Sequence, residues 1–243
     1  MNAIYDRIGI DYSQLRKPDP RIASRILEAL GPAQTVLNVG AGTGSYEPRD
    51  RRVTAIEPSL EMIRQRPASA APAMQGKAEA LPFADQSFDA CMAVLTVHHW
   101  GDKKQGMAEM RRVTRGPIVV VTFDPAHRGA WLNDYFPELV TLDETQMPRM
   151  SDYEQWLGPV RIEPLPIPRD CTDGFLYAYW ARPAAYLDEA VRSGISSFWK
   201  IGGLQAGLLR LRRDLESGEW ERRYGELRAQ EECDLGYRLV TAI

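Results

Sequence analysis

Three glycines at alternate positions, Gly40, Gly42 and Gly44, follow the mainly apolar run 36–39. A run of aliphatic and β-branched residues is typical of a strand that is buried on both faces of a parallel sheet. Because glycine has no Cβ, the turn can adopt positive φ, and a ligand can lie directly against the main chain. The pattern predicts a strand and a turn that binds a ligand through its backbone.

An acidic residue, Glu57, stands thirteen residues after the last glycine, at the end of a second predicted strand, 53–56. This position places a carboxylate beside the glycine turn, where it can accept two hydrogen bonds from a ribose diol. The spacing therefore predicts a nucleoside pocket. The alternative is a solvated strand-end carboxylate that caps the helix expected near Ser59.

Glycine turns of this kind occur in nicotinamide, flavin and S-adenosylmethionine binders, so the later segments 76–83 and 87–100 decide between these classes. Together with the glycine turn and the acidic strand end they form four ordered motifs between residues 15 and 123. In these motifs the chain resembles the class I S-adenosylmethionine-dependent methyltransferases, most closely the type 11 group of ubiquinone and menaquinone methyltransferases. The resemblance implies S-adenosylmethionine as cofactor and a Rossmann-like, mainly parallel seven-stranded sheet.

The resemblance also implies a role for each matching residue. The glycine turn packs against the methionine part of the cofactor, and Glu57 holds the ribose hydroxyls. The segment around Ala78 flanks adenine, the strand end at Leu95 lies under the sulfonium, and Arg16 approaches the methionine carboxylate. The other cofactor-binding residues implied in this way are Tyr12, Asn38, Ala41, Pro58, Glu79 and Thr96.

Three departures from the family pattern modify these expectations. Asn38 replaces a common acidic residue and accepts a hydrogen bond without carrying a charge, so it pairs more weakly with the cofactor ammonium. Lys77 replaces an aspartate that accepts from the adenine amino group, which leaves that contact to the backbone near Ala78 or to Glu79. The segment 45–52 is short for a crossover helix, and we expect only one or two helical turns there.

Strands that alternate with helices predict an α/β, doubly wound sheet. We expect helices over 21–30, 60–65 and 102–113, a buried strand over 118–123, and late sheet strands over 160–168 and 236–243 that pair antiparallel.

A chain of 243 residues fits one domain with elaborations. Within that single domain, 1–243, residues 15–125 are predicted to form the cofactor-binding core. Residues 130–158 and 170–225 are helical in pattern and rich in aromatic residues, and we interpret them as a cap over the carboxyl ends of the strands.

Net charge, apolar stretches and cysteine spacing limit the classes of function that this chain can have. The formal net charge of -3 makes a nucleic-acid partner improbable, because nucleic-acid binders usually carry a basic domain or stripe. No apolar stretch reaches the ~18 residues of a spanning helix, and residues 1–23 are too polar for a secretory signal. The three cysteines are widely spaced and predict neither a metal site nor a disulfide. We therefore expect a cytoplasmic enzyme that acts away from membranes; its oligomeric state stays open.

Few side chains have the chemistry to assist methyl transfer. His98 and His99 follow the strand that ends beneath the cofactor, and either is a candidate base for a hydroxyl acceptor, with His99 favoured. Adjacent residues leaving a strand point apart, so only one is expected to face the acceptor. Within the cap, Asp173 and Tyr179 are candidate acceptor contacts, and Arg182 is a candidate anchor for a carboxylate.

The sequence thus predicts methyl transfer to the oxygen, nitrogen or carbon of a small, partly apolar metabolite by in-line displacement. Two alternatives stay open: an RNA-modifying methyltransferase, and a catalytically silent protein that binds S-adenosylmethionine or a partner.

Overall fold

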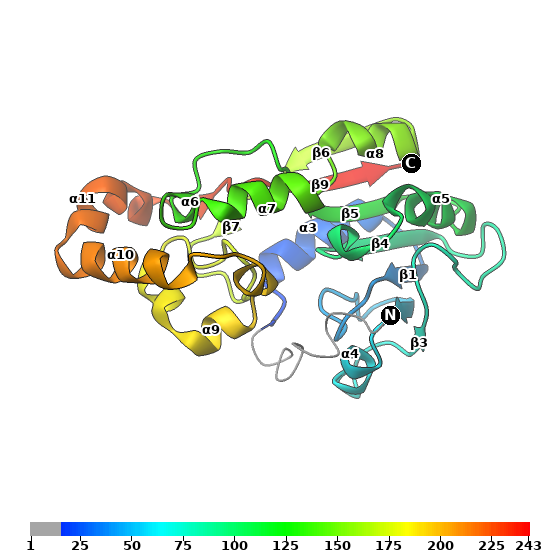
Figure 1. The fold of residues 1–243 in the computed structure, drawn as a ribbon. Helices are drawn as coiled ribbons and strands as arrows, with labels where there is room; N and C mark the ends of the chain where they lie inside the picture. Colours follow the sequence, from blue (N-terminus) through cyan, green and yellow to red (C-terminus); the bar gives the residue numbers. More distant parts are fainter. Residues whose placement is uncertain (1–15) are drawn as a thin grey trace.

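A seven-stranded sheet organises the computed structural model, which describes residues 16–243. Its strands are β1 (Thr35–Val39), β2 (Arg52–Glu57), β3 (Ala73–Gln75), β4 (Ala90–Val94), β5 (Ile118–Phe123), β6 (Val160–Pro164) and β9 (Tyr237–Ala242). The spatial order is β3-β2-β1-β4-β5-β9-β6 (Figure 1). The strands β1 to β5 are parallel, whereas β9 runs antiparallel to both β5 and β6. The predicted doubly wound, mainly parallel fold is confirmed.

Alternate side chains of the central strands enter two different cores, as the period of two in a strand requires. Val119 and Val121 of β5 join a core with the helix α3 (Pro20–Leu30), whereas Ile118 and Val120 join the opposite core. That second core contains the helices α5 (Lys103–Val113) and α8 (Met150–Leu157). The sheet is therefore covered by helices on both faces.

Five further helices among the described residues form most of the cap, which lies to the left in Figure 1. They are α6 (Leu132–Tyr135), α7 (Glu138–Gln146), α9 (Glu189–Ser193), α10 (Leu204–Glu216) and α11 (Glu219–Tyr224), with the 3-10 turns η2 (Pro183–Leu187), η3 (Ser196–Trp199) and η4 (Gly225–Ala229). Buried residues of these elements, such as Trp131 and Trp220, belong to the same core as α3. Cap and sheet are thus packed as one unit.

Some segments differ from their predicted form. The helix α8 packs on α5 and β6 rather than with the cap helices, although it lies within the predicted cap segment 130–158. The predicted strand 160–168 is divided: β6 ends at Pro164, and the short strand β7 (Ile167–Pro168) pairs with β8 (Glu232–Cys233) in a separate two-stranded sheet. Proline lacks the N–H that a continuous ladder needs, which explains the break.

The crossover between β1 and β2 contains turns but no helix, so the one or two helical turns expected there are wrong. Side chains hold this loop instead. The hydroxyl of Tyr46 donates to Asp173 at 2.9 Å, and Glu47 accepts two hydrogen bonds from Arg66 at 2.6 and 2.8 Å. Because these partners are far away in the chain, local sequence could not reveal them. After β2 the chain forms the short helix α4 (Leu60–Arg64), with Ser59 as its N-cap.

None of the helices in residues 16–243 is both long enough and apolar enough to cross a membrane.

Candidate functional site

A cavity of about 820 Å³ lies at the carboxyl ends of β1, β2 and β4. The size fits a nucleoside-containing ligand, because small-molecule sites span about 300–1,000 Å³. The predicted cofactor residues that line it are Arg16, Asn38, Gly40, Ala41, Gly42, Glu57, Pro58, Ala78, Glu79, Leu95 and Thr96. Gly44 lines a neighbouring cavity instead, and Tyr12 lies outside the described residues.

The glycine turn has the predicted backbone form. Gly40 and Gly42 have φ of +71° and +51°, and Gly40 packs so closely on Thr96 that an added Cβ would lie 2.1 Å from its Oγ1. At Gly42 an added Cβ would meet only the Met62 Cε, at 4.0 Å, and would project into open space. Gly40 is therefore required for packing, whereas Gly42 keeps the cavity wall flat.

The carboxylate of Glu57 joins the glycine turn to the helix that follows β2. It accepts a hydrogen bond from the backbone N–H of Gly42 at 2.8 Å and another from the N–H of Ser59 at 2.9 Å. Glu57 is 5% exposed and lines the cavity. A carboxylate has about four lone-pair positions, so these two bonds are compatible with further acceptance from a ribose diol. The helix α4 itself is capped by the Ser59 hydroxyl, which accepts from the N–H of Met62, so Glu57 fixes the chain before the helix instead of capping it.

A buried ion pair between Glu47 and Arg66 stabilises the glycine turn. Glu47 and Arg66 have side chains that are 5% and 6% exposed, and the Arg66 guanidinium also donates to the Gly42 carbonyl at 3.0 Å. The Asn38 amide donates to Glu47 at 3.1 Å. Asn38 thus connects the cavity wall to a carboxylate that sequence reasoning did not identify.

Arg16 enters the cavity from the other side and is held by the cap. Its guanidinium pairs with Asp173 at 2.5 Å, and the Asp173 carboxylate also accepts from Tyr46. Asp173 is fully buried. The Asp173 carboxylate, predicted as an acceptor contact, is engaged by Arg16 and by Tyr46 of the crossover loop, and it positions the arginine.

The opposite end of the cavity contains the segment expected to flank adenine. The Glu79 carboxylate accepts hydrogen bonds from the backbone N–H groups of Gly101 at 2.8 Å and Asp102 at 3.1 Å. Lys77 and Ala78 also line this part of the wall. Glu79 therefore fixes the loop before α5, and the backbone near Ala78 is the better candidate to contact a base.

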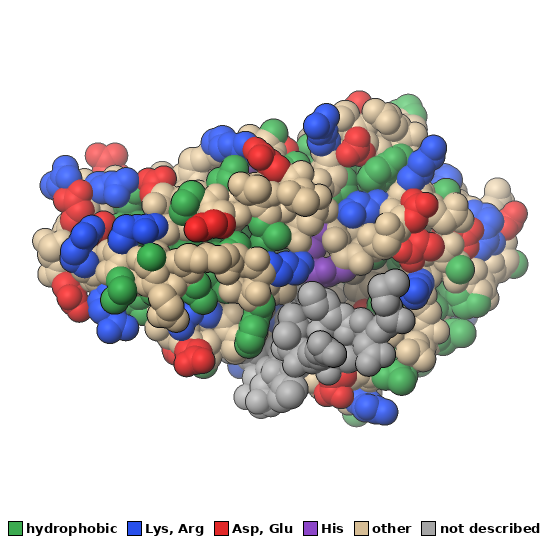
Figure 2. Space-filling view, in the orientation of Figure 1, with side chains coloured by type: hydrophobic (Ala, Val, Ile, Leu, Met, Phe, Trp, Pro, Cys, Tyr) green, Lys and Arg blue, Asp and Glu red, His purple; other side chains and the backbone are tan. Residues whose placement is uncertain are grey.

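His98 and His99 both line the same cavity, contrary to the expectation that they point apart. Their ring centroids are 3.8 Å apart, because the chain bends at Leu95 after β4 and enters the 3-10 turn η1 (Val97–His99) instead of continuing as extended chain. Figure 2 shows histidine side chains in the hollow between the sheet and the cap.

The two imidazoles are neutral at physiological pH. Burial, reinforced by the positive charges of Lys200, Lys103 and Arg16, lowers the pKa of His99 to about 3. Burial and the neighbouring imidazole lower the pKa of His98 as well. Neutral rings can accept hydrogen bonds, but their low pKa makes them weak proton acceptors.

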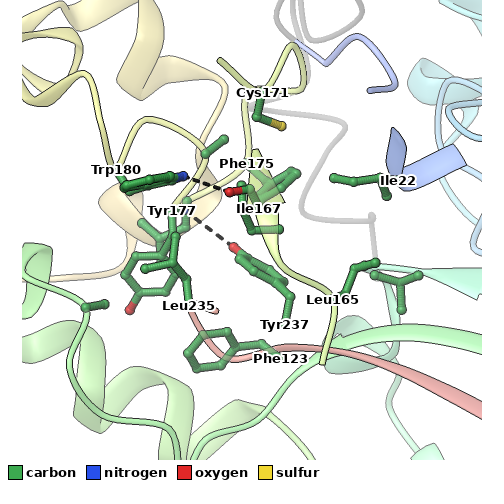
Figure 3. Close-up of a cluster of buried hydrophobic side chains, with 14 of the residues drawn as sticks. Ile22, Phe123, Leu165, Ile167, Cys171, Phe175, Tyr177, Trp180, Leu235 and Tyr237 are labelled. Atoms are coloured by element: carbon green, nitrogen blue, oxygen red, sulfur yellow. Dashed lines mark hydrogen bonds between the residues drawn. The ribbon is translucent and has the colours of Figure 1, made fainter. Parts of the chain in front are cut away.

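A smaller cavity of about 60 Å³ adjoins the first and shares Arg16, Leu95 and His98 with it. Leu95 is one of the few non-glycine residues with positive φ among those described, at +51°, which is a strained conformation typical of functional sites. The cap and sheet residues that complete the smaller cavity include Phe123, Asp143, Met147, Phe175, Tyr177, Ile195 and Tyr237. Figure 3 shows how several of these aromatic rings gather between β5, β9 and the loop after β7.

Tyr179 and Arg182 do not line either cavity. The Arg182 guanidinium lies over the Tyr179 ring, 4.7 Å from its centroid, and donates to the carbonyls of Cys171 and Ala178. These contacts stabilise the cap loop, so the predicted roles in acceptor contact lack a geometric basis in this structure.

Sequence reasoning missed Asp143, the carboxyl that lines the smaller cavity. Asp143 is 3% exposed on α7, four residues after the buried Leu139. Residues four apart share one face of a helix. The apolar residues of α7, however, are spread around the helix and do not form one face, so no signal in the sequence indicated that Asp143 is buried, and only the structure shows it.

Comparisons with known proteins agree with this geometry. Residues 37–117 match the methyltransferase domain family. A proposed methyltransferase from an antibiotic biosynthesis pathway of Anabaena variabilis has the same fold, with a TM-score of 0.88 and 35% identity over 95% of this chain and 99% of that chain.

Curated relatives of the chain are methyltransferases as well. The demethylmenaquinone methyltransferase of Renibacterium salmoninarum is 29% identical over 81% of each chain. The 2-methyl-6-phytyl-1,4-hydroquinone methyltransferase 2 of rice is 28% identical over 63% of this chain, which spans only 47% of that relative. The chain thus spans about half the length of the first curated relatives it matches. With its glycine turn, its acidic strand end and these likenesses, the chain belongs to the S-adenosylmethionine-dependent methyltransferases of the type 11 group.

Proposed function

We propose that this protein methylates a small, partly apolar metabolite bound between the strand ends and the cap. The observation that carries the proposal is the pair of adjoining cavities, one lined by the glycine turn and Glu57 and the other by aromatic cap residues. S-adenosylmethionine supplies a methyl group that is already activated on a sulfonium. The residues of the chain then have to align the acceptor and exclude water.

The proposed binding roles follow from the contacts. The main chain at Gly40 and Gly42 lies against the methionine part, Glu57 accepts from the ribose hydroxyls, and Arg16 faces the methionine carboxylate. The neutral rings of His98, which lines both cavities, and of His99, which lines the larger one, accept hydrogen bonds from the acceptor. The named acceptors of the relatives in Renibacterium and rice are a menaquinone precursor and a hydroquinone, which supports a quinol-like acceptor.

Calorimetry with S-adenosylhomocysteine tests the cofactor assignment. We expect micromolar binding and no binding of NADH, because the turn Gly40-Ala41-Gly42-Thr43-Gly44 lacks the Gly-x-Gly-x-x-Gly spacing of dinucleotide binders. Binding of NADH in place of S-adenosylhomocysteine would assign the chain to another class of enzyme.

The Glu57→Ala variant should bind S-adenosylhomocysteine more weakly by about 1–3 kcal/mol, because the hydrogen bonds from the ribose lose a charged acceptor. The variant must be measured where it is fully folded, since the N–H groups of Gly42 and Ser59 lose their acceptor as well. Glu61→Ala, on the adjacent helix α4, is the matched control and should keep the wild-type affinity. An unchanged affinity of Glu57→Ala would leave Glu57 with its structural contacts to Gly42 and Ser59 alone.

A further inference from the structure

A third cavity, of about 590 Å³, adjoins the cofactor cavity and has no role in the proposed function. Its walls come from three segments: residues 16–18 before α3, residues 43–53 of the crossover loop and β2, and residues 67–72 before β3. We call it the crossover cavity. Small-molecule sites span about 300–1,000 Å³, so a cavity of this size can hold a small molecule.

The crossover cavity is largely separate from the two cavities described above. It shares Arg16, Thr43 and Ser45 with the larger cavity, and it shares only Arg16 with the smaller one. Its other described lining residues belong to neither. A ligand in the crossover cavity is therefore a different molecule from the cofactor and the acceptor, although it lies next to the cofactor site.

The charged side chains that line the crossover cavity are almost all cationic. Among the residues that the structure describes they are Arg16, Lys17, Arg49, Arg51 and Arg52, against a single carboxylate, that of Glu47. This carboxylate is already neutralised by the buried guanidinium of Arg66, at 2.6 Å. Because the whole chain has a formal net charge of -3, the excess of positive charge is a local feature of this cavity.

Two of these cations are held by other groups. Arg16 pairs with Asp173, and the guanidinium of Arg51 donates to the Gly31 carbonyl at 2.8 Å and to the exposed Asp50 at 3.3 Å. The Arg51 side chain is only 10% exposed, so it forms a fixed part of the wall.

The other three cations, Lys17, Arg49 and Arg52, are exposed and form no ion pair within residues 16–243. Lys17 precedes α3, whereas Arg49 and Arg52 belong to the crossover loop and the start of β2. A run of exposed arginines along one segment is usually a solvated face. Here the fold brings cations of two distant segments to one concave surface, which is an arrangement that concentrates anions.

Phosphate oxygens match this set of groups better than a carboxylate does. The planar guanidinium of an arginine can bind two phosphate oxygens at once, and a lysine adds a point charge. The hydroxyls of Thr43, Ser45 and Ser69 also line the cavity, and a hydroxyl can donate to a phosphate oxygen. Three cations without a counter-charge among the described residues exceed the charge of one phosphate and favour two linked phosphates.

We propose that the crossover cavity binds a small molecule through a diphosphate group, beside the cofactor and separately from the acceptor. Lys17, Arg49 and Arg52 contact the diphosphate, and Arg51 lines the wall behind it. A bounded cavity favours a small molecule over a nucleic acid, which needs a basic stripe along the surface. The inference goes beyond the proposed function and does not depend on it.

Calorimetry on the full chain at physiological ionic strength (about 0.15 M) tests the proposal with inorganic pyrophosphate and orthophosphate as probes. We expect pyrophosphate to bind at least about tenfold more tightly than orthophosphate, because it meets more of the cations. Saturation with S-adenosylhomocysteine should not displace it. The double variant Lys17→Gln with Arg52→Gln should weaken pyrophosphate by about tenfold and leave the affinity for S-adenosylhomocysteine unchanged.

Lys104→Gln with Arg212→Gln is the matched control. Lys104 on α5 and Arg212 on α10 are exposed and line none of the three cavities, and their replacement changes the net charge by the same amount. This control should bind pyrophosphate as the wild type does. Equal weakening by the two double variants would show attraction by overall charge and overturn the proposal.

Three other results would also contradict a diphosphate site in the crossover cavity. They are no binding of pyrophosphate, displacement of pyrophosphate by S-adenosylhomocysteine, and tighter, strongly salt-dependent binding of a single-stranded uridine oligonucleotide. The second result would place the anion in the cofactor cavity, and the third would indicate a nucleic-acid partner. Failure of the wild type to bind S-adenosylhomocysteine would refute the proposed function alone, because pyrophosphate binding is measured without it as well.

Discussion

Replacing Glu47 with alanine should lower the free energy of unfolding by about 3–5 kcal/mol, because the guanidinium of Arg66 would stay buried without its counter-charge. Glu47 also accepts hydrogen bonds from the Asn38 amide and from the backbone N–H of Ala71. Its removal therefore breaks the connection between the crossover loop and the cavity wall. Chemical denaturation followed by circular dichroism gives the change in unfolding free energy.

The exposed pair of Arg161 and Glu163 on β6 provides the control. Their side chains are 66% and 34% exposed, so Glu163→Ala should change the unfolding free energy by only about 0–1 kcal/mol. The double variant Glu47→Leu with Arg66→Met should be less destabilised than Glu47→Ala, since no unpaired charge remains in the interior. Equal effects of Glu47→Ala and Glu163→Ala would show that the buried pair does not hold the loop.

Replacing Gly40 with alanine should lower the unfolding free energy by about 2–4 kcal/mol, from the positive φ and from the clash with Thr96 together. A displaced Thr96 also deforms the cavity wall, so we expect the affinity for S-adenosylhomocysteine to fall by at least about tenfold. Denaturation and calorimetry on the same preparation measure both effects.

Gly42→Ala is the informative comparison, because its backbone also has positive φ but its new methyl group meets open space. Its stability loss should be about 1–2 kcal/mol, which is the conformational part alone. Its affinity for S-adenosylhomocysteine should still fall, since the methyl group occupies the cavity. A Gly40→Ala variant as stable as Gly42→Ala would contradict the close packing on Thr96.

The sequence predicted well the helices and strands whose ends or burial depend on nearby residues, such as capping residues and apolar runs. The helix α5 begins after Asp102, which caps it through the N–H of Gln105, and α3 ends at Gly31, as the capping residues predict. The run 118–123 forms the fully buried strand β5, because its residues match the environment of a central strand. The glycine turn follows from the three glycines after the run 36–39, and the number of strands in the sheet follows from the family resemblance.

The features that sequence did not predict depend on contacts between distant segments. The crossover loop has no helix because Tyr46 and Glu47 are held by Asp173 and Arg66, which lie 127 and 19 residues further along the chain. The paired orientation of the histidines depends on where β4 stops and the 3-10 turn starts, and element ends are poorly specified by local sequence. Asp143 acquires its environment only when α7 meets the aromatic residues of the cap and the sheet.

The position of β9 has a consequence for how the protein is made. This strand fills the place between β5 and β6, and β6 has no other partner among the described strands of the sheet. While a ribosome is still synthesising the chain, the mainly apolar strand β5 lacks its neighbour on one edge until residues 237–242 have emerged. The unpaired backbone groups of an exposed strand edge can form hydrogen bonds with strands of other nascent chains. The sheet should therefore be completed only after residues 237–242 have emerged, and cells short of chaperones should accumulate the protein in inclusion bodies.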